Sequence, residues 1–373
     1  MSVQSREKNM RLDQRLADPL IRWFHETARD LPWRRNRSPW HVWVSEIMLQ
    51  QTRVNTVIPY YEQFMERFPT CTDLAEAPLD TVLKLWEGLG YYSRAKNLWR
   101  GANYVLSHCD AQVPSTYEEI IKIPGIGDYT AGAILSLAFN LPYPAVDGNV
   151  VRVVARLTNS PWTQGNTKDR TIARNYVQQL LDEYPTKAAS INEAFIELGA
   201  MICRPQTPNC DICPVHPFCL AADTGTAATL PLSKKSKKRP VDYMTILVIK
   251  DLFSGLYPVR RRSPDGLLGG LWEFPYLDGH RSREEVALLL ESDGYELLDI
   301  LPLTPRRHIF SHLEWDMIGW SAVVKPITLI PDTTPLVLTD AVDDGISWVD
   351  DQELFQKAMA TAIAPFRDEA VPS

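Results

Sequence analysis

The stretch "IPGIGDYTAG", residues 123–132, decides the fold of the first part of the chain. Pro124 and two glycines, Gly125 and Gly127, separate one helix-like run from the next, which predicts a tight helix-hairpin-helix. Glycine is needed where φ is positive or where another backbone comes close. The start of the second helix exposes backbone N–H groups, where phosphates bind. Two interpretations stay open: a phosphate-binding hairpin, or a corner that uses glycine for geometry only.

The sequence on both sides of this hairpin has the apolar spacing of helices. Ser115 and Glu118 in "PSTYEEIIKI" form an S-x-x-E pattern, which predicts a capping box at the start of the helix before the hairpin. No stretch before residue 240 has convincing strand-like alternation. We therefore expect residues 1–221 to form an all-α domain.

From Asp242 onward the chain becomes rich in β-branched and aromatic residues with turn signals between them. Runs such as "YMTILVIK" and "HIFSHLEWDMIGWSAVVK" predict strands, and "SREEVALLLESDG" predicts one amphipathic helix. We expect an α+β domain over residues 242–373. Residues 222–241 between the two domains are small, polar and then basic, which predicts an exposed linker. Its run "KKSKKR" either contacts a DNA backbone or only keeps the linker soluble.

The chain of 373 residues is long enough for two or three domains. Its net charge of −7 is uneven, because residues 241–373 carry 11 Lys and Arg against 22 Asp and Glu. Phosphate contacts are local, so this acidity does not exclude nucleic-acid binding by the N-terminal part. No apolar run approaches the roughly 20 residues of a membrane helix, and no secretory signal is visible. We expect a cytoplasmic protein with reduced cysteines and no membrane partner.

Four of the six cysteines fall within 17 residues, in the spacing C-x6-C-x2-C-x5-C. They are Cys203, Cys210, Cys213 and Cys219. In a reducing compartment such a group predicts a metal site with four thiolate ligands. The spacing alone leaves zinc and an iron–sulfur cluster open. All four ligand positions are filled, which favours a structural role for the metal over a catalytic one.

The hairpin, an aspartate 20 residues after Gly127 in "PAVDGNVVRV" and the cysteine spacing together resemble the endonuclease III superfamily of DNA glycosylases. Within it, "WVSEIMLQQTRV" and "WEGLGYYSRAKNL" resemble the adenine DNA glycosylase family, and the likeness covers essentially the whole chain. The resemblance implies a [4Fe-4S] cluster in the loop 203–219 and a Nudix-like domain at 242–373. It implies base excision repair by removal of adenine mispaired with 8-oxoguanine or guanine in double-stranded DNA. We expect a monomer.

Breaking an N-glycosidic bond calls for an acid near the base and an anion near the sugar. Glu46 lies on a helix with apolar residues all round, so we expect desolvation to raise its pKa. Asp147 precedes a helix, so we expect a capping carboxylate held by backbone N–H groups. A solvent-facing glutamate and a simple cap are the alternatives. The resemblance implies that Glu46 protonates the adenine and activates water, and that Asp147 stabilises the oxocarbenium ion.

Tyr129 directly follows the hairpin. Strand-cutting relatives have a lysine here, which forms a Schiff base with the sugar, and a tyrosine cannot do so. The sequence therefore predicts base removal without efficient strand cleavage. In the resembling family, a tyrosine at this position shields the site and helps to hold the aspartate.

The resemblance also implies which residues bind the flipped base and the lesion. The adenine pocket consists of Arg29, Trp33, Arg34, Glu193 and Ile196. DNA and the lesion are contacted by Leu49, Gln51, Thr52, Tyr91, Gly125, Gly127, Phe310, Ser311 and His312. Ordinary packing or surface ion pairs are the alternatives for these residues. We further expect Arg306 and Arg307 to face DNA.

"GGLWEFP" resembles the start of a Nudix box, but the acidic core that binds the metal in Nudix hydrolases is missing, so we expect no nucleotide hydrolysis. Two rival functions stay open. One is another base specificity, such as thymine or uracil in mismatches, and the other is a lesion-binding protein without catalysis. Retention of both carboxylates argues against the second rival.

Overall fold

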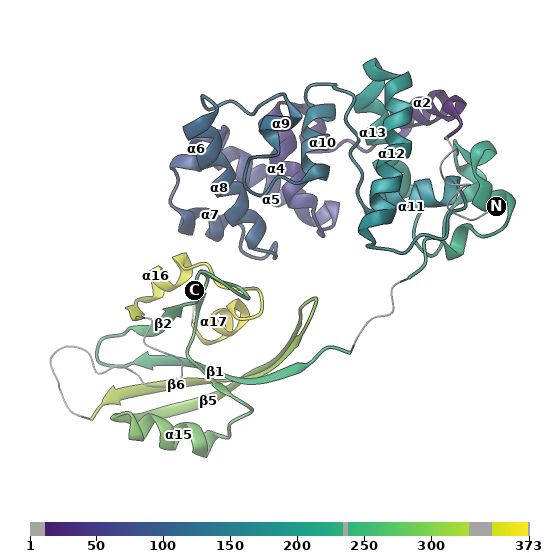
Figure 1. The fold of residues 1–373 in the computed structure, drawn as a ribbon. Coiled ribbons are helices and arrows are strands. Elements are labelled where there is room, and N and C mark those ends of the chain that lie inside the picture. Colours follow the sequence, from purple (N-terminus) through teal and green to yellow (C-terminus); the bar gives the residue numbers. More distant parts are fainter. Residues whose placement is uncertain (1–11, 234–237, 328–344, 372–373) are drawn as a thin grey trace. The chain divides into compact units, whose positions relative to one another are not determined.

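The computed structural model describes residues 12–233, 238–327 and 345–371. The chain divides into two compact units (Figure 1). The first contains Met1–Glu76 and Asn97–Ser236, and the second contains Ala77–Lys96 and Lys237–Ser373. The domain boundaries predicted from the sequence, 1–221, 222–241 and 242–373, remain a prediction. The observed division differs from them because the helical segment Ala77–Lys96 belongs to the unit of the C-terminal sheets.

The first unit is helical, as the sequence predicts, with short 3-10 turns between its helices. Its helices are α2 (Ala17–Thr27), α3 (Pro32–Arg35), α4 (Pro39–Leu49), α5 (Val54–Arg67), α6 (Cys71–Glu76), most of α8 (Ser93–His108), α9 (Tyr117–Ile120), α10 (Asp128–Leu137), α11 (Gly148–Leu157), α12 (Thr167–Glu183), α13 (Ala188–Met201) and α14 (Leu220–Asp223). One hydrophobic core joins α2, α11, α12 and α13. None of the helices in the described ranges has the length and apolar character that crossing a membrane demands.

Two close contacts fix the positions of α4, α10 and the segment before α11. Helix α4 begins with a Ser38 cap and Pro39 at its first position, both favoured at helix starts, and is buried from Val42 to Met48. It packs against α10. A Cβ atom at Gly132 of α10 would lie 2.2 Å from the carbonyl oxygen of Pro144, so only glycine fits there. This close approach brings the segment before α11 against α10.

The helix before the hairpin begins one residue later than the sequence predicts. Thr116, not Ser115, is the N-cap of α9, and its hydroxyl donates to the carboxylate of Glu119 at 2.7 Å. The predicted capping box of Ser115 and Glu118 is therefore wrong. The sequence "STYEE" contains the pattern in two overlapping registers, and local chemistry does not distinguish them.

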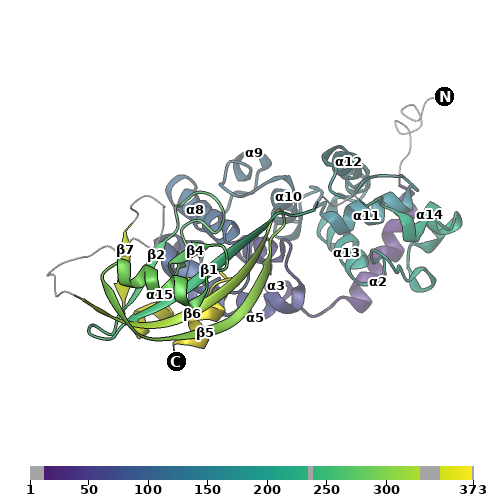
Figure 2. The same cartoon turned by 90° about the horizontal axis from the view of Figure 1, so that it is seen from below.

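The second unit contains one mixed sheet, one antiparallel sheet and helices. Its elements are α7 (Leu79–Leu85), β1 (Val241–Asp251), β2 (Tyr257–Arg261), β3 (Trp272–Glu273), β4 (Tyr276–Asp278), α15 (Arg283–Ser292), β5 (Tyr295–Ile309), β6 (Glu314–Pro326), β7 (Ile346–Val349), α16 (Asp351–Gln356) and α17 (Ala364–Ala370). The larger sheet has the order β4-β1-β6-β5, with β1 parallel to β6, and the smaller has the order β3-β2-β7. Figure 2 shows β1, β6 and β5 running side by side as long curved strands. The predicted α+β fold is confirmed.

Most of strand β5 lies outside the runs that the sequence predicts as strands, and it contains Pro302 and Pro305. Proline cannot donate to a sheet ladder, which normally argues against a strand. The conflict is resolved by position, since β5 lies at the edge of its sheet and its register with β6 shifts between Leu303 and Arg306. Edge strands and bulges tolerate proline.

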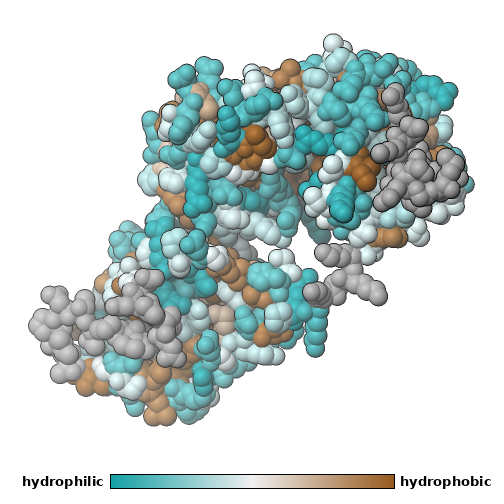
Figure 3. Space-filling model, in the orientation of Figure 1, coloured by the Kyte–Doolittle hydropathy of each residue, from teal (hydrophilic) through white to brown (hydrophobic). Residues whose placement is uncertain are grey.

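The surface seen in Figure 3 is mostly hydrophilic, with separate hydrophobic patches. In the second unit, Leu288 of α15 and Leu301 of β5 are about two thirds and more than half exposed. Phe253, in the turn after β1, is 80% exposed.

Candidate active site

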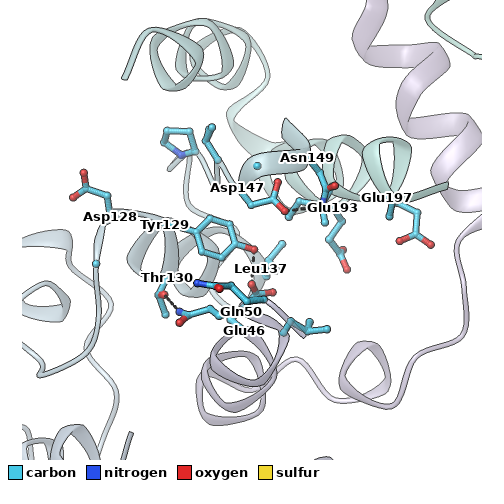
Figure 4. Close-up of a pocket in the computed structure, with 18 of the residues that line it drawn as sticks. Glu46, Gln50, Asp128, Tyr129, Thr130, Leu137, Asp147, Asn149, Glu193 and Glu197 are labelled. Carbon is cyan, nitrogen blue, oxygen red and sulfur yellow. Dashed lines mark hydrogen bonds between the residues drawn. The ribbon is translucent and has the colours of Figure 1, made fainter. Parts of the chain in front are cut away.

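A cavity of about 700 Å³ opens among α4, α10, α11, α12 and α13 of the helical unit (Figure 4). All the catalytic and adenine-pocket residues predicted from the sequence line this cavity, together with both hairpin glycines and three residues at the end of α4. These residues are Glu46, Tyr129, Asp147, Arg29, Trp33, Arg34, Glu193, Ile196, Gly125, Gly127, Leu49, Gln51 and Thr52. The fold thus brings together residues that are far apart in the sequence.

Glu46 lies in the buried part of α4, with only 7% of its surface exposed. Burial raises the pKa of Glu46 to about 7; the nearby charge of Asp147 also raises it, whereas a hydrogen bond from Tyr129 lowers it. The predicted desolvation of Glu46 is confirmed. A carboxyl group with this pKa populates both protonation states near neutral pH, which suits an acid that later acts as a base.

Tyr129 is the second residue of α10, directly after the hairpin. Its hydroxyl points towards Glu46 and donates a hydrogen bond of 2.5 Å to Oε2 (Figure 4). Burial and the charge of Glu46 raise the pKa of Tyr129 well above its ordinary value, so the hydroxyl stays a donor. The bond fixes the orientation of the Glu46 carboxyl group in the cavity.

Asp147 is the N-cap of α11, as predicted. Its Oδ1 accepts the backbone N–H of Val150 at 2.8 Å, and its Oδ2 accepts the side-chain amide of Asn149 at 2.7 Å. Burial raises the pKa of Asp147, and these hydrogen bonds oppose the rise without reversing it. The cap therefore fixes the carboxylate, while its enclosure strengthens the attraction to any positive charge that forms beside it.

A buried cluster of charges lies at the α13 side of the cavity. Glu197 is fully buried, and Arg29 holds it with two hydrogen bonds of 2.7 Å while Arg34 adds one of 3.0 Å. Burial raises the pKa of Glu197, but these bonds outweigh it and bring the pKa to about 2. Arg34 also approaches Glu193 at 3.3 Å, and Arg37 approaches it at 2.8 Å. The cluster fixes Arg34 at the cavity wall.

Sequence reasoning missed Glu197, Arg37 and Gln50. Glu193 and Glu197 stand four residues apart in an otherwise apolar helix, and that pattern was the available signal for a buried acidic pair. Gln50 lines the cavity and donates to the Thr130 hydroxyl at 3.4 Å. Oε2 of Glu193 is buried, and its ion pair with Arg37 lacks hydrogen-bond geometry, so this oxygen can still accept a donor.

The two hairpin glycines have different structural reasons. Gly125 has a φ of +84°, and a Cβ atom there would lie 2.6 Å from the Cβ of Asn97, so the fold itself requires glycine. Gly127 has a φ of −104°, and a Cβ atom would meet nothing within 4 Å. Nothing inside the described part of the protein explains the second glycine. An external group that approaches the backbone of Gly127 would explain it.

All four clustered cysteines are free thiols, and Cys203 is close enough to the other three for its charge to raise their pKa values, in addition to burial. Arg156, only 1% exposed, donates to the sulfur of Cys203 at 3.2 Å and to three backbone carbonyls around the loop. A buried cation beside several thiols suits a negatively charged cluster. Among the described residues, no group of three or more His, Cys, Asp or Glu side chains is arranged so that it could hold a metal ion.

A continuous path of hydrogen bonds joins the cysteine loop to Asp147. Arg152 donates through Nε to the carbonyl of Cys203 at 2.8 Å, and through Nη2 to Oδ1 of Asn149 at 2.8 Å. Asn149 in turn donates to Oδ2 of Asp147. Arg152 is buried, so these contacts are shielded from water. The order of the cysteine loop therefore bears on the orientation of the capping carboxylate.

The remaining predicted residues lie in the second unit. Phe310, Ser311 and His312 form the turn between β5 and β6, where Ser311 and His312 are exposed and Phe310 packs edge-on against Trp315 at 4.9 Å. Tyr91 is 48% exposed. The two arginines expected to face DNA are engaged within the unit: Arg306 pairs with Glu369 and Arg307 with Asp316, each at 2.9 Å.

Two family models match separate parts of the chain. Residues 44–179 match the HhH-GPD superfamily of base excision DNA repair proteins, and residues 246–369 match the NUDIX domain. Among solved structures, a thermostable thymine-DNA glycosylase aligns with a TM-score of 0.52 and 24% identity. The alignment covers 60% of this chain and all of that one. That likeness concerns the fold alone.

Curated relatives cover nearly the whole chain. The adenine DNA glycosylase of Rattus norvegicus is 34% identical over 92% of this chain and 75% of its own length. The Homo sapiens enzyme is 33% identical over 92% of this chain and 72% of its own length. The Arabidopsis thaliana enzyme is 37% identical over 70% of this chain and 47% of its own length. With both domains matched and the predicted catalytic and adenine-pocket residues gathered around one cavity, the chain belongs to the adenine DNA glycosylase family.

Proposed function

We propose that this protein removes adenine mispaired with 8-oxoguanine or guanine from double-stranded DNA, as a step of base excision repair. One observation carries the proposal: Glu46, whose pKa is about 7, shares a cavity with the capped carboxylate of Asp147. An acid and an anion in one cavity are what hydrolysis of a glycosidic bond requires. The rat and human relatives carry the name of this activity.

The adenine first leaves the base stack and enters the cavity, which costs a few kcal/mol of unstacking. Trp33, Arg34 and Ile196 line the space for it, and Oε2 of Glu193 accepts its amino group. Trp33 is buried and fixed edge-on against Tyr61 at 5.4 Å, so the pocket wall is formed before the base arrives. Binding energy is then not spent on ordering the pocket.

Protonated Glu46 donates its proton to N7 of the adenine while the bond between N9 and C1′ breaks. The adenine leaves as a neutral base, and the positive charge that remains on the sugar is stabilised by Asp147. Glu46, now a carboxylate, takes a proton from the water that attacks C1′. The products are free adenine and an abasic site, and Glu46 regains the proton that it gave.

Tyr129 keeps the Glu46 carboxyl group in place and cannot form a Schiff base with the sugar. The reaction therefore ends at the abasic site, and the strand stays intact. A test is the state of the product strand, which we expect to break only after treatment with hot alkali. Cleavage without that treatment, or trapping of a covalent complex by borohydride, would contradict this assignment.

We assign a [4Fe-4S] cluster to Cys203, Cys210, Cys213 and Cys219. Four free thiols beside the buried Arg156 support it, and the cluster would hold the loop together without entering the reaction. Analysis for iron, zinc and acid-labile sulfide in the purified protein tests the assignment. Zinc without iron or sulfide would overturn it.

The lesion is assigned to other residues. Leu49, Gln51, Thr52 and Tyr91 contact the base opposite the adenine, and Phe310, Ser311 and His312 recognise 8-oxoguanine. Exposed polar side chains in a turn beside an aromatic ring suit a modified purine. Gly127 accepts the approach of a DNA phosphate, and the protein acts as a monomer.

Single-turnover reactions test the function as a whole. Duplexes with adenine, thymine or uracil opposite 8-oxoguanine or guanine are compared for the wild type and Glu46→Gln. We expect release of adenine only, and a loss of about 100-fold or more in Glu46→Gln. Release of thymine or uracil would indicate a different specificity, and binding without release of any base would indicate a lesion-binding protein.

A further inference from the structure

The loop Gly88–Tyr92 of the second unit has an unusual backbone. Gly88, Gly90 and Tyr91 have φ angles of 97°, 73° and 49°. A tyrosine with positive φ is uncommon, and such a conformation persists only where the surroundings hold it. Tyr91 is nevertheless 48% exposed. The Tyr91 ring is therefore exposed to solvent, and its backbone conformation must be held by neighbouring residues.

Arg94 fixes the loop from within the same segment. It is 7% exposed, and its Nη2 donates to the carbonyls of Leu89 and Gly90 at 3.3 and 3.0 Å. Its guanidinium lies 5.4 Å from the centre of the Tyr91 ring and 5.5 Å from that of Trp86. A planar guanidinium can hold two carbonyls and face an aromatic ring at once, which a lysine cannot do.

The C-terminal part of the same unit fixes the loop from both flanks. The backbone N–H of Met359 donates to Oε1 of Glu87 at 3.1 Å, and its carbonyl accepts the Tyr92 hydroxyl at 3.0 Å. Both polar groups of one backbone position are therefore satisfied by residues that bracket the loop. Arg367, 6% exposed, adds an ion pair to the same Oε1 at 3.3 Å.

We propose that Glu87, Tyr92 and Arg94 are positioning residues for Tyr91, and that Met359 and Arg367 transmit the state of the C-terminal domain to this loop. The preference for 8-oxoguanine over guanine then has two origins in the second unit. One is direct contact by the turn between β5 and β6, and the other is the presentation of Tyr91. The inference rests on the proposed function, in which Tyr91 contacts the base opposite the adenine.

The test is a double-mutant cycle on the full chain. Tyr92→Phe removes the hydroxyl that donates to the carbonyl of Met359 and accepts the backbone N–H of Gly88 at 3.3 Å. Single-turnover rates are measured on duplexes with adenine opposite 8-oxoguanine and opposite guanine. We expect the ratio of the two rates to fall about three- to tenfold, because the loop loses the two hydrogen bonds of this hydroxyl. In a Tyr91→Ala background, Tyr92→Phe should change the ratio less than twofold, because the positioned group is gone.

Arg367→Met tests the other flank of the loop, since it keeps an apolar side chain and removes the ion pair with Glu87, together with the one to the neighbouring Asp368. It should lower the same ratio and lose its effect in the Tyr91→Ala background. Tyr104→Phe makes the matched chemical change in α8, where the ring stacks on His108, and should leave the ratio unchanged. Thermal unfolding of each variant separates a local effect from loss of the fold.

The outcomes are distinguishable. An equal fall in the ratio with and without Tyr91, for both Tyr92→Phe and Arg367→Met, would overturn the inference while leaving the proposed function intact. A wild-type ratio in Tyr91→Ala alone would remove the lesion role of Tyr91 and the inference with it. Absence of adenine release by the wild type would instead refute the proposed function itself.

Discussion

Glu46 owes its high pKa to burial and not to a single charged partner. Its helix is apolar on nearly every side, and α10 closes over it with Tyr129. The contrast with Glu197 is instructive, because that carboxylate is also buried but has a pKa of about 2. The difference in pKa arises because Arg29 and Arg34 donate hydrogen bonds to Glu197. One glutamate is available for proton transfer and the other is a fixed anion.

The pH dependence of base removal follows from Glu46. Only its protonated form can act as the acid, so the rate should fall about tenfold per pH unit above a midpoint near pH 7. Single-turnover rates at sub-saturating enzyme report this pKa for the free protein. The descending limb should disappear from the small residual rate of Glu46→Gln. A wild-type rate that stays level well above pH 7 would contradict the assigned acid.

The same pKa predicts that Glu46 lowers the stability of the folded protein above neutral pH. The pKa of Glu46 is about 7 in the folded state and near 4.5 when unfolded, so the folded state binds the proton more tightly. Stability is therefore lost as pH rises from about 4.5 through 7, by on the order of 3 kcal/mol. Glu46→Gln avoids this loss and should unfold at a higher temperature than the wild type above pH 7.

The higher stability of Glu46→Gln relative to the wild type should vanish near pH 4.5 and below, where Glu46 is largely protonated in both the folded and the unfolded state. Glu66→Gln, a matched change at an exposed position of α5, should show neither effect. Thermal unfolding at several pH values measures both variants. A Glu46→Gln protein no more stable than the wild type above pH 7 would show that burial does not strain this carboxyl group.

At the residue scale, the sequence predicted what depends on local pattern. The burial of Glu46 followed from an apolar helix, and the cap of Asp147 followed from its place before one. The role of Glu197 did not, because its partners Arg29 and Arg34 are more than 160 positions away in the chain. The net direction of the Asp147 pKa shift also depends on burial by distant elements.

At the element scale, the hairpin allows a matched pair of substitutions. Gly125→Ala places a Cβ atom against Asn97 at positive φ, and should cost roughly 1–3 kcal/mol of unfolding free energy. Gly127→Ala meets open space at an ordinary φ, and should change stability by less than about 0.5 kcal/mol. It should instead weaken binding to duplex DNA, because the added methyl group lies where a phosphate would approach.

Thermal unfolding and titration with a duplex that lacks a removable adenine measure the two effects. Tight DNA binding by Gly127→Ala would indicate that the second glycine serves the hairpin geometry only. The two glycines are alike in the sequence, and only the φ angles and the space around each residue distinguish them. The misplaced capping box has a similar origin, since Ser115 and Thr116 offer equivalent patterns one residue apart.

At the scale of the whole molecule, we assign catalysis to the first unit and recognition of 8-oxoguanine by Phe310, Ser311 and His312 to the second. Phe310→Ala and Ser311→Ala should therefore lower the rate on adenine opposite 8-oxoguanine, by about 10-fold or more for the aromatic residue. The rate on adenine opposite guanine should change less than about threefold. Measuring both duplexes in parallel tests this separation. Equal losses on the two duplexes would argue against a role in lesion recognition.

The overall organisation was predictable because composition changes sharply near Asp242, from helical spacing to β-branched and aromatic residues. The sequence did not predict which unit contains the segment Ala77–Lys96, because its amphipathic pattern does not specify which core it joins. The acidity of the C-terminal part is partly explained by the structure. Arg306 and Arg307, expected to face DNA, are paired with carboxylates of their own unit.

The two prolines of β5 have a consequence for solubility. An edge strand that exposes Leu298 and Leu301 next to free backbone groups is a template for pairing with a second copy. Pro302 and Pro305 remove two backbone donors from the strand, and the shift in register beside them interrupts its regularity. The same two prolines that argue against a strand in the sequence therefore also disfavour pairing of this edge with a second copy of the chain.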